Sequence, residues 1–180
     1  MRIACFLSAS YVAKAYHDAA YKLGYRLGQE GHTLVFGGYR NGTMASIADG
    51  FADAEAAIIG VVSDVLENER VKHRGLREIY YSKDLLDRKQ KMIELSDAFI
   101  ALPGGTGTLD ELTEVMTGHA IGQSSPIIII YNIMGFYDHL IAQLKLMEQQ
   151  GFIHKNSGNL YQIASSPDEV IEILNQNSEV

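Results

Sequence analysis

The sequence predicts an α/β fold, a Rossmann-like parallel sheet with helices on both faces, within a single nucleotide-binding domain spanning residues 1–180. Apolar strand-like runs alternate with helical patterns almost from end to end. Several runs are continuous rather than alternating, as expected of strands that are covered on both faces. No repeat or linker divides the chain, and a chain of 180 residues can bury roughly 70% of its unfolded surface.

Six strands and six helices account for most of the chain. The expected strands are 3–7, 33–36, 57–62, 78–81, 98–102 and 127–131. The expected helices are 13–30, 44–54, 85–95, 108–120 and 137–149, each with apolar residues at helical spacing. A last short helix is expected within 165–176, "SSPDEVIEILNQ", where a serine cap and a proline mark its start.

The composition is that of an ordinary soluble globular protein, with 47% hydrophobic and 21% charged residues. A formal net charge of −7 argues against a nucleic-acid-binding face. The only cysteine, Cys5, lies in an apolar run, so no disulfide forms within the chain. Neither a signal peptide nor a run of membrane-spanning length is evident. We therefore expect a cytoplasmic protein without membrane or nucleic-acid partners.

Ligands of parallel sheets bind at the carboxyl ends of the strands. The glycine-rich stretch "PGGTGT" follows one such end, and Gly104, Gly105 and Gly107 allow a ligand to approach the backbone. A helix begins here, whose first amides and dipole favour an anion, and Thr106 and Thr108 add hydroxyl donors. The P-loop lysine is missing, which argues against ATP hydrolysis. A plain strand-to-helix turn capped by threonine explains the same residues and stays open.

Acidic residues open the helix that follows this turn. At 100° per residue its buried stripe consists of Leu109, Leu112, Val115 and Met116. Glu111 falls at the edge of that stripe, where it could reach a ligand held by the preceding loop. Asp110 and Glu114 fall on the far side, as solvated acids near a helix start.

A second glycine-rich loop, "GGYRNGTM", follows the strand 33–36. Gly37, Gly38 and Gly42 again precede a helix, and Thr43 is either a phosphate donor or a helix cap. The loop is not G-x-G-x-x-G, and no acid ends the next strand, so a dinucleotide oxidoreductase is disfavoured. The six histidines lack metal-ligand spacing, and no G-x-S-x-G motif supports a serine hydrolase.

The helix 85–95 leads to the strand before "PGGTGT" and carries Arg88, Lys89 and Lys91. A charged, solvated helix face is the default interpretation of these residues. Arg88 and Met92 share one face at i, i+4, and the helix starts on the functional rim of the sheet. Arg88 is for that reason a candidate site residue.

Together these motifs resemble the Lonely guy (LOG) family of cytokinin-activating phosphoribohydrolases, formerly described as lysine decarboxylases. The family motif P-G-G-x-G-T-x-x-E stands complete at 103–111, and R-K-x-x-M stands at 88–92. The resemblance continues through "HTLVFGG", "LSDAFIALPGG" and "GFYDHL" and covers roughly residues 1–155. The chain departs from the family in "LLD" before Arg88, in "GGYRNGTMA", and in "SAS" at 8–10. These departures suggest a divergent branch.

The resemblance implies that the chain splits the N-glycosidic bond of an adenine-type nucleoside 5′-monophosphate, such as a cytokinin riboside monophosphate or AMP. Arg88 and Glu111 would be catalytic. The phosphate and ribose would lie against Gly104, Gly105, Thr106, Gly107 and Thr108, and further substrate contacts would come from Ser8, Gly37, Gly38, Thr43, Lys89 and Met92. No metal or other cofactor is implied, the partner is a small-molecule nucleotide, and a homodimer is expected.

Two other functions are compared with the same residues. A non-catalytic carrier of a nucleotide or of the molybdenum cofactor, with a LOG-like fold, would keep the glycine loops and tolerate loss of Arg88 or Glu111. A lysine decarboxylase would need a Schiff-base lysine deep in a pocket. Because the lysines lie mainly on predicted helix faces, the sequence argues against that chemistry.

Overall fold

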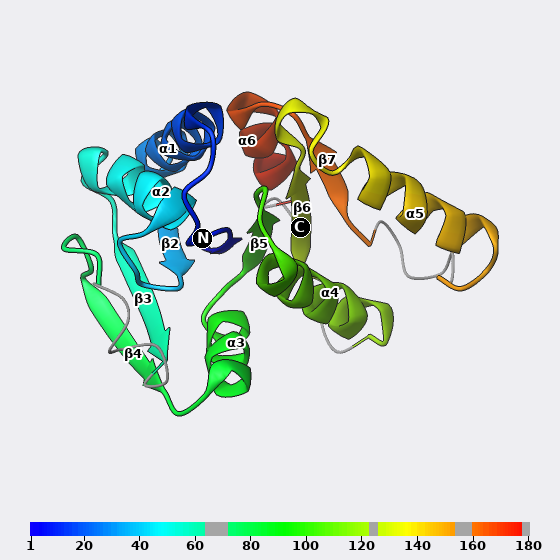
Figure 1. Cartoon of the computed structure of the whole chain (residues 1–180), viewed down its shortest axis with the longest axis horizontal. Helices are drawn as coiled ribbons and strands as arrows, with labels where there is room; N and C mark the ends of the chain where they lie inside the picture. The colour runs from blue at the N-terminus through cyan, green and yellow to red at the C-terminus, as the bar shows by residue number, and fades with distance from the viewer. Residues whose placement is uncertain (64–71, 123–125, 154–159, 178–180) are drawn as a thin grey trace.

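Seven parallel strands form one sheet in the computed structural model, which describes residues 1–63, 72–122, 126–153 and 160–177 (Figure 1). The strands are β1 (Arg2–Phe6), β2 (Thr33–Phe36), β3 (Ile58–Ser63), β4 (Glu78–Ser82), β5 (Ala98–Ala101), β6 (Ile127–Tyr131) and β7 (Gln162–Ala164). Their order is β4-β3-β2-β1-β5-β6-β7, and every pairing is parallel. The predicted fold class is confirmed.

In the described part of the chain, six α-helices cover the two faces of the sheet (Figure 1). They are α1 (Lys14–Gln29), α2 (Gly42–Asp53), α3 (Leu85–Glu94), α4 (Thr106–Ala120), α5 (Asp138–Gln149) and α6 (Pro167–Gln176). Buried side chains of α1, α2 and α6 share one core cluster, and those of α3, α4 and α5 share the other. The helices therefore divide three to each face.

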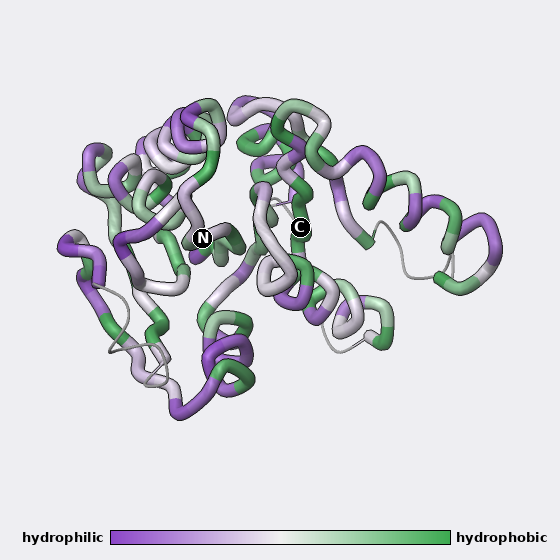
Figure 2. Tube along the Cα trace, in the orientation of Figure 1, coloured by the Kyte–Doolittle hydropathy of each residue, from purple (hydrophilic) through white to green (hydrophobic). Residues whose placement is uncertain are grey.

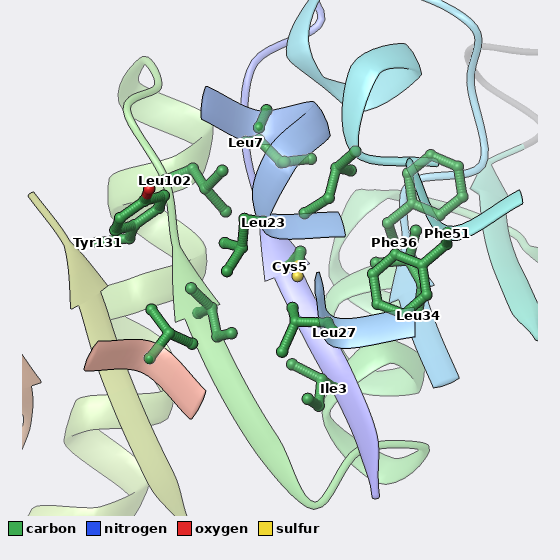
Figure 3. Close-up of a cluster of buried hydrophobic side chains, with 14 of the residues drawn as sticks. Ile3, Cys5, Leu7, Leu23, Leu27, Leu34, Phe36, Phe51, Leu102 and Tyr131 are labelled. Carbon is green, nitrogen blue, oxygen red and sulfur yellow. The ribbon is translucent and has the colours of Figure 1, made fainter. Parts of the chain in front are cut away.

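Alternation along the five inner strands, β1, β2, β3, β5 and β6, supplies both cores. Ile3 and Cys5 of β1 face the core under α1, whereas Ala4 and Phe6 face the core under α3 and α4. Figure 3 shows Leu23 and Leu27 of α1 packed over β1, with Phe36 and Phe51 beside them. Central strands are hydrophobic, while α5 carries alternating hydrophilic and hydrophobic bands (Figure 2). The continuous apolar runs in the sequence thus correspond to strands covered on both faces.

Beyond one-residue shifts at the ends of elements, some details differ from the sequence-based expectation. Helix α2 begins at Gly42, two residues earlier than expected, so Gly42 and Thr43 belong to its first turn. The edge strand β7 was not predicted, because its three residues are too short for a periodic pattern and only Ala164 among them is buried. Helix α4 begins at Thr106, two residues earlier than expected, with Gly105 in an extended N-cap conformation. Gly107 and Thr108 therefore belong to the first helical turn and not to the loop.

The strand order reverses beside β1, which pairs with β2 on one side and β5 on the other. This is the switch point at which open α/β sheets form ligand clefts. The loop after β1 and the start of α2 are joined there, because the backbone N–H of Ser8 donates to Thr43 Oγ1 (3.2 Å) and the Thr43 hydroxyl donates to the Ser8 carbonyl (3.1 Å). None of the helices in the described ranges has the length and apolarity that crossing a bilayer requires.

Candidate active site

The N-terminus of α4 opens towards solvent at the end of β5. Gly105 is the N-cap, no side chain caps the helix, and Gly105, Thr106 and Gly107 are exposed. A Cβ on Gly104 would lie 2.1 Å from Thr108 Oγ1, so the buried Thr108 packs against a position where only glycine fits. Uncapped amides at the positive end of a helix dipole form an anion site. Thr108 contributes through packing, while residues 105–107 present the open surface.

Arg88 lies on α3 with only 10% of its side chain exposed. Its Nε donates to the carbonyl oxygen of Val61, at the carboxyl end of β3, over 2.8 Å. A Cβ on Gly37 would lie 1.9 Å from Arg88 Nη2, and the Tyr39 ring centroid lies 6.0 Å from the guanidinium carbon. The glycine at 37 therefore makes room for the buried guanidinium.

Glu111 faces Arg88 across a short gap. Arg88 Nη1 lies 3.8 Å from Glu111 Oε1, which is within ion-pair range but too long for a hydrogen bond. Burial raises the pKa of Glu111 from its ordinary 4.5 to about 7, Arg88 and Lys89 oppose the rise, and Asp110 adds to it. The site thus holds a carboxyl group that changes its charge near neutral pH.

The neighbours of Arg88 on α3 have different environments. Lys89 Nζ lies 3.0 Å from an Asp110 carboxylate oxygen and 3.1 Å from one of Glu114. Met92 is 1% exposed and packs in the core beneath the helix. Lys89 joins α3 to α4, and Met92 anchors α3 to the sheet.

The glycine-rich stretch 37–44 after β2 lies beside Arg88 and the loop after β1. Gly38 has a φ of +78°, and its carbonyl accepts a 2.9 Å hydrogen bond from the backbone N–H of His73. Thr43 is 2% exposed, with its hydroxyl engaged by the Ser8 backbone as described above. The structure thus brings Gly37 and Glu111 to Arg88, and Thr43 to Ser8. The Gly38 carbonyl and the Thr43 hydroxyl are thus both engaged in hydrogen bonds within the protein.

A pocket of about 250 Å³ lies at the switch point, next to the α4 N-terminus. Its lining is Ser8, Ser10, Val12, Tyr16, Pro103, Gly104, Gly105 and Phe136. The Tyr16 and Phe136 rings meet edge to face with centroids 5.9 Å apart. Sequence reasoning assigned these two aromatic residues no site role, although Phe136 stands in the "GFYDHL" stretch, just beyond the end of β6.

Two further groups could not have been found from sequence patterns. The Val61 carbonyl that holds Arg88 is a backbone atom with no residue signature. The buried Tyr39 fills the space beside Arg88, and its hydroxyl exchanges hydrogen bonds with the Ser63 backbone. Within the residues that the structure describes, no three His, Cys, Asp or Glu side chains are grouped to hold a metal ion.

Fold and site together define a Rossmann-like α/β protein with an exposed, uncapped helix N-terminus and a buried Arg–Glu pair. A family model described as "Possible lysine decarboxylase" matches residues 44–174. Probable cytokinin riboside 5′-monophosphate phosphoribohydrolase LOGL2 of rice (Oryza sativa subsp. japonica) is 33% identical over 98% of this chain and 73% of its own length. Cytokinin riboside 5′-monophosphate phosphoribohydrolase LOG4 of Arabidopsis thaliana is 33% identical over 98% of this chain and 83% of its own length.

The chain belongs to the Lonely guy (LOG) family of phosphoribohydrolases, as the sequence motifs predicted. At the level of the family, the prediction of an N-glycosidic bond hydrolase is confirmed.

Solved structures confirm the fold. The molybdenum cofactor binding protein of Rippkaea orientalis superposes with a TM-score of 0.76 at 23% identity, covering 98% of this chain and 96% of its own. The Moco carrier protein of Chlamydomonas superposes with a TM-score of 0.74 at 16% identity, covering 97% and 95%. At such identities the likeness concerns the fold alone.

The raised pKa of Glu111 makes a prediction for stability. Between about pH 5 and pH 8 the folded protein binds a proton on Glu111 that the unfolded chain has released, so stability falls as pH rises. Glu111→Gln removes this dependence. Its unfolding free energy relative to the parent protein is expected to rise by up to about 3 kcal/mol across that interval, measured by urea denaturation at several pH values. The exposed Glu172→Gln on α6 is the control, and parallel curves for all three proteins would contradict the assignment.

Proposed function

We propose that this protein hydrolyses the N-glycosidic bond of nucleoside 5′-monophosphates with an adenine-type base, releasing the free base and ribose 5-phosphate. The observation that carries the proposal is the buried pair of Arg88 on α3 and Glu111 on α4, 3.8 Å apart. Glu111 lies on the helix whose open N-terminus can take an anion. The names of the family relatives, cytokinin riboside 5′-monophosphate phosphoribohydrolases, support the same reaction.

The phosphate of the substrate binds at the start of α4 in this proposal. The exposed backbone at Gly105, Thr106 and Gly107 offers amide donors, and the helix dipole favours the dianion. Gly104 and Gly105 also line the 250 Å³ pocket together with Ser8, whose hydroxyl accepts a 3.0 Å bond from the Ser10 N–H. A fixed phosphate orients the ribose, which lowers the entropic cost of reaching the reactive geometry.

Glu111 acts on the anomeric carbon in this mechanism. Cleavage of the glycosidic bond builds positive charge on the ribose ring, and a carboxylate beside C1′ stabilises that charge or activates the attacking water. Both roles need the ionised form, so the rate of base release rises with pH through about 7, where Glu111 loses its proton. Arg88 favours that ionised form and orients the substrate. No step requires a metal ion or a redox group.

Lysine decarboxylation is disfavoured by the charge of Lys89, the lysine that follows Arg88 on α3. A Schiff-base lysine must be a neutral nucleophile, which requires a lowered pKa. Burial lowers the pKa of Lys89, but its hydrogen bonds to Asp110 and Glu114 outweigh that effect, and the pKa is raised. Its ammonium group is therefore held in the unreactive form.

The finer expectations from the sequence stay predictions. They are the adenine-type base, the homodimer and the cytoplasmic location. A carrier of a nucleotide or of the molybdenum cofactor remains the alternative function, and it is an outcome of the experiment below.

We expect free base to be released from AMP or isopentenyladenosine monophosphate, with GMP and CMP as comparison substrates, when product is followed by chromatography. Glu111→Gln keeps the size of the side chain and removes its charge, so kcat is expected to fall by about 10³-fold or more. Arg88→Ala is expected to lose activity as well, while the exposed Glu172→Gln on α6 leaves it unchanged.

Calorimetric titration with AMP separates the alternatives. Binding without release of base from any of the four nucleotides would overturn the hydrolase proposal for these substrates and favour the carrier. Release that survives Glu111→Gln would overturn the role given to Glu111.

Gly37→Ala tests whether the glycine-rich loop after β2 makes room for Arg88. The new methyl group would overlap Arg88 Nη2, so the guanidinium must leave its present position beside Glu111. The displacement of the guanidinium is expected to lower kcat by about 100-fold. Arg40→Ala, an exposed change in the same loop, is the matched control. An unchanged kcat in Gly37→Ala would show that the position of Arg88 is not critical.

A further inference from the structure

A second ion-pair contact lies directly beside the Arg88–Glu111 pair. Lys89 follows Arg88 on α3, and Asp110 precedes Glu111 on α4, so two neighbouring residues of one helix face two of the other. Lys89 Nζ lies within 3.0–3.1 Å of both Asp110 carboxylate oxygens and 3.1 Å from Glu114. A single ammonium group thus bridges two carboxylates of the helix that carries Glu111.

The contact of Lys89 with Asp110 and Glu114 joins α3 to α4. Asp110 and Glu114 are separated by four residues on α4, so their like charges lie on one face and repel each other. Lys89 compensates that repulsion and links α4 to α3. Only 11% of the Lys89 side chain is exposed, against 66% for Asp110 and 52% for Glu114. The lysine is the enclosed member of the contact.

Lys91 provides a comparison on the same helix. Its Nζ pairs with Glu94 of α3 itself at 3.4 Å, and 37% of its side chain is exposed. This pair lies on one helix surface, where such contacts contribute little. Position 89 therefore differs from position 91 in joining two helices.

We propose that Lys89 is a positioning residue, which clamps α4 to α3 through Asp110 and Glu114 and thereby sets the gap between the Arg88 guanidinium and the Glu111 carboxylate. This inference rests on the proposed function and deepens it. It also assigns Lys89 a role other than the substrate contact that the sequence suggested.

The clamp also controls the charge around Glu111. Among the described residues, Arg88 and Lys89 face Glu111 from α3, and Asp110 and Glu114 flank it on α4. Arg88 and Lys89 lower the pKa of Glu111, and Asp110 raises it. Loss of the Lys89 charge leaves both acids uncompensated, so the pKa of Glu111 rises further.

The test compares Lys89→Met with the matched Lys91→Met by two measurements. Lys89→Met is expected to move the acidic limb of the kcat/KM profile for base release upward by about one pH unit. It should lower kcat at neutral pH about tenfold while changing KM less than about threefold. Lys91→Met should match the parent protein, and Lys89→Arg should recover part of kcat because it retains the charge.

The second measurement follows the Glu111 side-chain carboxyl by ¹³C NMR as a function of pH. It needs no activity, so a parent protein that releases no base would overturn the proposed function while the titration still decides the role of Lys89. The midpoint for Glu111 is expected to rise in Lys89→Met. In Asp110→Asn, which removes an acid at the other end of the clamp, it is expected to fall.

Three results would overturn the clamp. They are an unchanged Glu111 midpoint in Lys89→Met, a rise of KM alone, which would indicate direct contact with substrate, and equal effects in Lys91→Met. Should Lys89→Met fail to fold, Asp110→Asn carries the test, and a midpoint that stays at the parent value would overturn the proposal.

Discussion

The buried guanidinium of Arg88 is the constraint on which the rest of the site depends. A charge with so little access to water is tolerated only when it is paired and hydrogen-bonded. Three separate parts of the fold supply this environment, namely the carbonyl of Val61, the bare backbone of Gly37 and the carboxylate of Glu111. The end of β3, the loop after β2 and helix α4 are therefore all matched to one side chain on α3.

The parallel sheet explains why these parts meet. Every strand of the sheet runs in the same direction, so the carboxyl ends of β1, β2, β3 and β5 lie along one edge. The order reverses beside β1, and the pocket lined by Ser8 and Gly105 lies at that point. The core on one side of the sheet holds α3 and α4, the helices that carry Arg88 and Glu111. The parallel direction of the strands therefore determines which residues meet at the candidate site.

Sequence patterns predicted the fold and the principal site residues, but not the contacts among them. Arg88 and Glu111 were found because a motif marked them, while helical periodicity placed Glu111 only at the edge of an apolar stripe. Thr43 shows the limit of such reasoning, since a threonine in a glycine loop fits a phosphate donor, a helix cap and the observed bonds to the Ser8 backbone equally well. The hydrogen bond from Arg88 to the Val61 carbonyl and the contact between the Tyr16 and Phe136 rings depend on tertiary structure, which local patterns do not encode.

The most direct test of the account is a crystal structure of the Glu111→Gln variant with AMP bound. Phosphate oxygens are expected within about 3.2 Å of the amides at the start of α4. C1′ of the ribose is expected to lie against the side chain at position 111, on the side that faces Arg88. A nucleotide whose phosphate binds away from that helix terminus, or whose C1′ lies outside the reach of both side chains, would contradict the central claim.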